Sequence, residues 1–142
     1  MNKYFLYLRI AGHALDFDQI SSSLHADFPY KIMREGEACN TRFHPGRVHA
    51  EDVWLSEYVS NEEEPIESAL YEFISAYLPA KEFVRELSAL HDVSFVCSIY
   101  PDDNQCGIIL SKNVISVASD MQASIRIEAA FLKEFYQGSN NK

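Results

Sequence analysis

The sequence is short of glycine and of basic residues, and each shortage argues against a class of function. Its five glycines are scattered and form neither a G-x-G-x-x-G nor a Walker pattern, so we expect no phosphate-cradling loop. Twelve Lys and Arg face 21 Asp and Glu, a formal charge of -9. Nucleic acids and anionic membrane surfaces both require a basic face, so we expect neither as a partner. No apolar run approaches the ~20 residues of a membrane span, and we expect a cytoplasmic protein without a leader segment.

Cysteine is also scarce, and the chain holds an odd number of them: Cys39, Cys97 and Cys106. We expect reduced thiols, with a bridge between Cys97 and Cys106 across a hairpin as the alternative. Cys39 shares the segment 37–50 with His44 and His49, but this segment lacks the tight ligand pairs of a structural zinc site. Nucleophile elbows and paired carboxylates are missing too. We therefore expect no metal, no cofactor and no enzymatic activity.

The residues that are abundant indicate a well-packed globular domain. Hydrophobic residues make up 47% of the chain and aromatic residues 13%. A chain of this length buries enough surface to fold without stabilising disulfides or metal ions. We expect one domain over residues 1–136, followed by a polar, disordered tail over 137–142.

Alternating polar and apolar residues predict six strands, over 4–11, 30–35, 53–59, 93–100, 106–110 and 124–129. Asp16 and Ser111 can cap helices, because their side-chain oxygens accept free amide hydrogens of a first turn. Apolar residues at helical spacing over 66–90 predict two consecutive helices, or one sharply kinked helix, with the break at Pro79. The predicted fold class is α+β: a two-layer sandwich with a mostly antiparallel sheet of about six strands and helices on one face.

The predicted strands have one apolar side and one mixed side. We assign Leu6, Leu8, Ile10, Val53, Leu55, Phe95, Ile99, Ile108, Leu110, Ile125 and Ile127 to the side under the helices. We assign Phe5, Tyr7, Arg9, Trp54, Ser56, Tyr58, Ser94, Ser98, Tyr100, Arg126 and Glu128 to the other. A surface rich in Tyr, Trp, Arg and Ser is typical of recognition patches. It also suits a homodimer interface, or a surface under a lid formed by 37–50.

Arg9 stands out because a guanidinium inside an apolar strand needs a carboxylate or water. The structural interpretation is an ion pair with Glu35, Glu57 or Glu128. The functional interpretation is a clamp for an anionic ligand.

Several segments resemble the bacterial family called domain of unknown function 4279, over about residues 3–130. They are Tyr4 to Gly12 with Leu15-Asp16, Arg34-Glu-Gly-Glu37, Trp54 entering a strand, the helical region with Pro79, Val93 to Tyr100, Gly107, and Leu110-Ser111. The resemblance implies no established activity. Small bacterial proteins of this kind are often suspected of acting as immunity proteins beside toxins, so the resemblance suggests that role only by analogy.

The leading functional hypothesis is a binding module, of which an immunity-type protein that binds a basic protein partner is one form. We expect the contacts to come from Tyr7, Arg9, Trp54, Tyr58 and Tyr100. Self-association as a homodimer through the same surface is a second form of this hypothesis. The alternative is a small-ligand sensor or enzyme that holds an anion at Arg9.

Overall fold

The computed structural model describes residues 3–24, 28–39, 46–58, 64–100 and 107–129. Within these ranges, five strands and four α-helices follow one another. In order they are β1 (Lys3–Gly12), α1 (Phe17–Leu24), β2 (Tyr30–Met33), β3 (Asp52–Tyr58), α2 (Ile66–Ser75), α3 (Lys81–Leu90), β4 (Asp92–Tyr100), α4 (Lys112–Asp120) and β5 (Ser124–Ala129), with a 3₁₀ turn (Leu78–Ala80) between α2 and α3.

The five strands form one sheet in the order β2-β3-β1-β4-β5. Every neighbouring pair is antiparallel except β4 and β5, which are parallel and joined through α4. A parallel pair needs such a crossover because a tight turn cannot connect its ends. The predicted α+β class with a mostly antiparallel sheet is therefore confirmed.

The sheet has five strands where the sequence predicts about six. The predicted strand over 106–110 is wrong for residues 107–110, which have no regular structure, and residue 106 lies outside the described part of the chain. The position beside β4 is taken by β5, and 107–110 leads into α4 instead. Ile108 and Leu110 still pack against the core, which explains why the segment carries alternating apolar residues.

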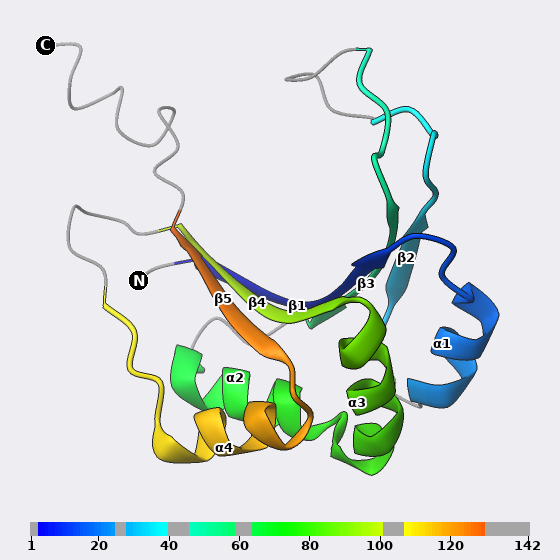
Figure 1. Cartoon of the computed structure of the whole chain (residues 1–142). Helices are drawn as coiled ribbons and strands as arrows, with labels where there is room; N and C mark the ends of the chain where they lie inside the picture. Colours follow the sequence, from blue (N-terminus) through cyan, green and yellow to red (C-terminus); the bar gives the residue numbers. More distant parts are fainter. Residues whose placement is uncertain (1–2, 25–27, 40–45, 59–63, 101–106, 130–142) are drawn as a thin grey trace, which may run out of the picture.

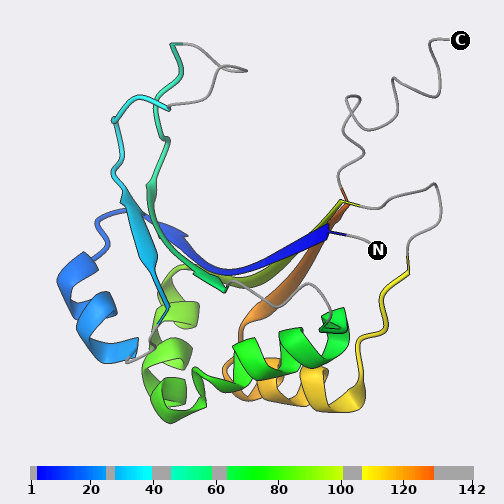
Figure 2. The same ribbon diagram turned by 180° about the vertical axis from the view of Figure 1, so that it is seen from behind.

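All four helices lie on the same side of the sheet, as Figures 1 and 2 show. Two of them begin where the predicted caps are. The Gln19 amide donates to Asp16 Oδ1 over 3.1 Å, and the Val114 amide donates to Ser111 Oγ over 3.3 Å. Pro79 lies in the 3₁₀ turn that separates α2 from α3, which confirms two consecutive helices. Proline fits this turn because it cannot donate a hydrogen bond inside a helix.

The hydrophobic core lies between the helices and the sheet. On the central strand β1, Leu6, Leu8 and Ile10 are completely buried there. Aromatic rings fill the centre of this layer: Phe73 meets the rings of Tyr77 and Phe95 edge-on, with centroids 5.6 and 6.0 Å away. Such contacts add to the free energy gained by burying the rings themselves.

Strand β3 faces the opposite way from its predicted orientation. Its register pairs Ile10 with Trp54 and Leu6 with Tyr58, so both aromatic residues lie on the helix side. Residues directly opposite in a sheet point to the same face. Placing Val53 and Leu55 under the helices and Trp54, Ser56 and Tyr58 on the other face was therefore wrong.

Residues 36–39 and 46–49 form an antiparallel arm that continues beyond β2 and β3. Backbone hydrogen bonds join Cys39 to Arg47 and His49 to Glu37, each 2.8 Å long. In Figure 1 the arm rises at one end of the sheet and does not run back across it. A lid formed by the described parts of 37–50 is therefore not observed. Residues 40–45 lie outside the described part of the chain.

Asp52 fastens the arm and the first helix to the start of β3. Its Oδ1 accepts the Glu35 amide over 2.8 Å, and its Oδ2 accepts the Leu15 amide over 3.0 Å. These two backbone donors hold the pKa of Asp52 below its ordinary value of 3.8. The Asp52 carboxylate thus fixes both the segment before α1 and the segment before the arm, which are far apart along the chain.

We predict that Asp52→Asn lowers the free energy of unfolding by about 2 kcal/mol at neutral pH, because an amide cannot accept both donors. The stabilisation by Asp52 exists above its unfolded-state pKa and is lost as pH falls through the lower folded-state pKa. The difference between native protein and variant should therefore shrink in acid. Urea unfolding at several pH values measures it. Glu86→Gln, at an exposed position on α3, is the control, and an equal effect of both changes would contradict this account.

Candidate functional site

The side of the sheet opposite the helices is concave, and none of the described helices lies on it (Figure 1). We call it the open face. Strand alternation and register define its members. They are Lys31, Met33, Val53, Leu55, Glu57, Phe5, Tyr7, Arg9, Ala11, Asp92, Ser94, Val96, Ser98, Tyr100, Ser124, Arg126 and Glu128. The predicted mixed surface therefore exists, but only part of its predicted membership is correct.

Three of the five predicted contact residues lie on the open face, on two adjacent strands. Tyr7 and Arg9 come from β1, and Tyr100 comes from the end of β4. Trp54 and Tyr58 do not join them, because they lie on the helix side of β3. A contact surface that combines all five residues is thus excluded by the register.

Trp54 and Tyr58 are on the helix side because their polar atoms find partners there. Trp54 is 3% exposed, and its indole nitrogen donates to Ser21 Oγ on α1 over 3.0 Å. The Tyr58 hydroxyl donates to Glu64 Oε2 over 3.1 Å. Burial, together with this carboxylate, raises the pKa of Tyr58 to about 12. Aromatic residues with a polar atom can be buried when that atom is bonded.

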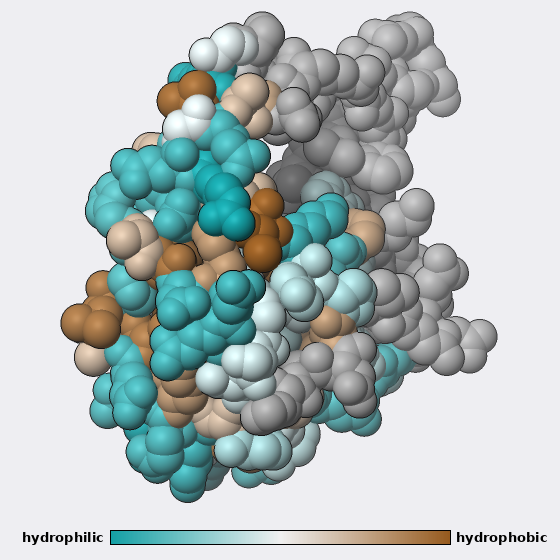
Figure 3. Space-filling view, turned by 90° about the vertical axis from the view of Figure 1, so that its right-hand side faces the viewer, coloured by the Kyte–Doolittle hydropathy of each residue, from teal (hydrophilic) through white to brown (hydrophobic). Residues whose placement is uncertain are grey.

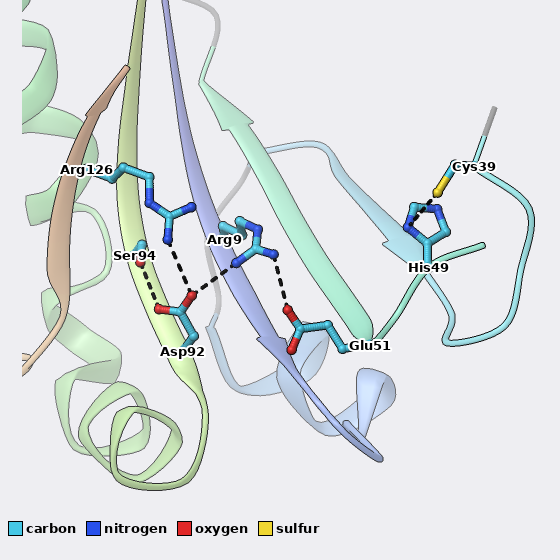
Figure 4. A network of polar contacts seen from close by, with 7 residues as sticks. All are labelled: Arg9, Cys39, His49, Glu51, Asp92, Ser94 and Arg126. Atoms are coloured by element: carbon cyan, nitrogen blue, oxygen red, sulfur yellow. Dashed lines mark hydrogen bonds and ion pairs between the residues drawn. The ribbon is translucent and has the colours of Figure 1, made fainter. Parts of the chain in front are cut away.

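Arg9 is held by two carboxylates on the open face, as Figure 4 shows. Its guanidinium donates to Asp92 over 3.1 Å and to Glu51 over 3.4 Å. The structural interpretation of Arg9 as an ion-paired residue is therefore correct. Its predicted partners Glu35, Glu57 and Glu128 are wrong, because the side chain extends toward the ends of the strands where Asp92 and Glu51 lie.

Asp92 connects a second arginine to this network. Arg126 on β5 approaches the same Oδ2 to 3.6 Å, while Ser94 donates to Oδ1 over 3.0 Å. The two guanidinium groups therefore share one carboxylate (Figure 4). Asp92 and Glu51 were missed from the sequence. The alternation of side chains along β4 could have predicted the position of Asp92, because Asp92, Ser94 and Tyr100 fall on the same side of the strand.

Tyr7, Ser98 and Glu128 form a separate polar cluster further along the open face. The Tyr7 hydroxyl lies 3.4 Å from Ser98 Oγ and donates to Glu128 Oε2 over 3.3 Å, and Ser98 donates to the same Oε2 over 3.3 Å. Partial burial and the negative charge of Glu128 raise the pKa of Tyr7. The phenol therefore stays protonated at neutral pH and remains a donor.

Two aromatic rings lie at the end of the open face beyond this cluster. Phe5 and Tyr100 meet edge-on with their centroids 5.6 Å apart. Phe5 is 42% exposed although it sits on the central strand of the sheet. Tyr100 is half-buried. An aromatic pair that solvent can reach, beside hydrogen-bonding groups, suits a binding surface.

The charges on the open face are unevenly paired. Arg9 and Arg126 are both engaged with carboxylates. Within the described ranges, by contrast, no cation forms an ion pair with Glu57 or Glu128. Lys31 on β2 is likewise without an ion pair among the described residues, so these groups leave two negative charges and one positive charge on this surface.

The edge of the sheet at β2 is a second candidate for a binding site, weaker than the open face. Tyr30 and Ile32 on this edge strand are 50% and 38% exposed. Figure 3 shows the side of the molecule that carries β2 and α1. Hydrophilic residues predominate there, and hydrophobic ones form small separate areas. Large binding sites more often expose a contiguous apolar patch.

Neither a metal site nor a membrane span is found in the described part of the chain. No group of three His, Cys, Asp or Glu side chains there could hold a metal ion. Cys39 lies beside His49, but no third ligand joins them among the described residues. None of the helices in these ranges is long and apolar enough to cross a membrane.

Fold and site together define an α+β protein whose mixed sheet is covered by helices on one side and open on the other. The family model of the domain of unknown function DUF4279 matches residues 2–132, and the chain belongs to this family. Searches of curated proteins and of solved structures found no match.

We predict that Asp92→Asn lowers the free energy of unfolding by about 1 kcal/mol, because it removes the charge that two arginines share. The pairs are partly exposed, so the loss should decrease at high salt, where charges are screened. Denaturant unfolding at low and high salt measures both effects. Glu82→Gln, which breaks a single surface pair with Arg85, should cost less. An Asp92→Asn effect no larger than that of the control would contradict a shared role.

Proposed function

We propose that this protein is a protein-binding module that engages a basic partner through its open face. The observation that carries the proposal is the aromatic pair of exposed Phe5 and half-buried Tyr100, next to carboxylates without a described cation partner. Aromatic rings bury a large area on binding at little cost in side-chain entropy. Carboxylates without a cation partner favour a binding partner that carries positive charge.

The charge of the partner follows from what the open face leaves unpaired. Glu57 and Glu128 can accept Lys or Arg side chains from a partner without breaking an ion pair with a described residue. The whole chain carries a formal charge of -9, which speeds encounter with a positively charged protein. An immunity-type protein that blocks a basic toxin is one form of this proposal. That form rests on analogy alone.

An anion sensor or enzyme at Arg9 has less support. An anionic ligand would have to displace Asp92 or Glu51 from the guanidinium, and it would meet their negative charge. Arg126 offers no free clamp either, because it lies against the same Asp92 carboxylate. The arginines fit better as elements that hold the open face in shape.

A photo-crosslinking residue at position 5 tests the proposal in cells of the native host. We expect benzoylphenylalanine at Phe5 to crosslink to a specific basic protein. The same residue at Tyr71, on the helix side, should not do so. Phe5 and Tyr71 are equally exposed, at 42% each, so the pair controls for accessibility.

The captured protein then needs a binding measurement with the purified components. We expect Glu128→Lys to weaken the affinity by about tenfold, because it places a cation opposite a basic partner. Glu86→Lys on α3 makes the same charge change away from the open face and should have little effect. Equal crosslinking from both positions, an acidic partner, or equal effects of the two lysine variants would overturn the proposal.

A further inference from the structure

The arm beyond β2 and β3 brings a thiol and an imidazole together. Cys39 and His49 lie on its two strands, which are fixed in register by backbone hydrogen bonds and the bridge between Ala38 and Val48. The Cys39 Sγ lies 3.7 Å from His49 Nδ1, within hydrogen-bond distance for sulfur (Figure 4). Both residues are half-buried, so solvent can reach the pair.

We propose that Cys39 is a modification site, a thiol that reacts with small disulfides and uses His49 as its base. A nucleophile within hydrogen-bond distance of a base is the geometry that activates thiols. With Nδ1 unprotonated, the thiol hydrogen points at His49, and the imidazole can take the proton as the sulfur attacks. The backbone pairing of the arm holds Cys39 and His49 next to each other, so no bound molecule is needed to bring them together.

The chemistry needs only one co-reactant, a low-molecular-weight disulfide. The Cys39 proton moves to His49, and the thiolate attacks one sulfur of the disulfide. A new S–S bond forms to Cys39 while the old one breaks, and the released thiolate takes the proton from His49. The products are a mixed disulfide on the protein and one small thiol.

The rest of the structure makes the reaction selective between the two described cysteines. Cys97 is completely buried on the helix side of β4, away from solvent. Its thiol can be reached only when the domain opens. The reaction should therefore label Cys39 in the folded protein and Cys97 only after unfolding.

Glutathione disulfide and peptide mass spectrometry test the proposal on the full chain. After trypsin, Cys39 lies in the peptide that follows Arg34. Cys97 shares the peptide that follows Arg85 with Cys106, so fragment ions are needed to distinguish these two cysteines. We expect the adduct on the first peptide, with a rate at least about tenfold above that of His49→Asn. His13→Asn removes an exposed histidine that contacts Glu35 and not Cys39, and it should leave the rate unchanged.

Unfolding in urea gives a second readout, which separates the effect of His49 from the intrinsic reactivity of the thiol. Once the arm is unfolded, Cys39 no longer lies beside His49, so the native protein and His49→Asn should react at the same rate. A missing adduct on Cys39 in the folded protein, an undiminished rate in folded His49→Asn, or a rate difference that persists in urea would overturn the proposal.

Discussion

The structure depends on the register of β1 between its two antiparallel neighbours, β3 and β4. That register places Leu6, Leu8 and Ile10 under the helices and puts Trp54 and Phe95 on the same side of the adjacent strands. Because side chains alternate strictly along a strand, a shift by one residue would move the buried set of β1 to the open face. The core, the open face and the positions of the charged residues all follow from this one alignment.

The two faces of the sheet differ in how their polar groups are satisfied. On the helix side, the polar atoms of Trp54, Tyr58 and Tyr77 are bonded within the protein, and the Tyr77 hydroxyl donates to Ser56 Oγ over 2.9 Å. On the open face, carboxylates, guanidinium groups and hydroxyls form two networks, around Asp92 and Glu128, that remain partly exposed. A buried polar atom must be bonded inside the protein, whereas an exposed one can also bond to a partner. This difference makes the open face the surface that suits recognition.

Local signals predicted much of the fold, and non-local ones did not. The alternation of β1, the caps at Asp16 and Ser111 and the break at Pro79 each depend on residues close in sequence, and each is confirmed. The orientation of β3 was wrong because hydropathy alone places Val and Leu inside and Trp and Tyr outside. The hydrogen-bond partners that allow Trp and Tyr to lie on the helix side, such as Ser21 for Trp54, come from elements distant in sequence. Of the predicted contact residues, those on β1 and β4 keep their face, since alternation suffices there, whereas those on β3 do not.

Fluorescence of Trp54 tests the central claim most directly, because it is the single tryptophan of the chain. The register puts its indole on the helix side at 3% exposure. We expect blue-shifted emission that acrylamide quenches weakly in the native protein and much more strongly after unfolding in urea. Native emission at the position of free tryptophan, quenched as strongly as in urea, would place Trp54 on the open face and contradict the alignment on which the account depends.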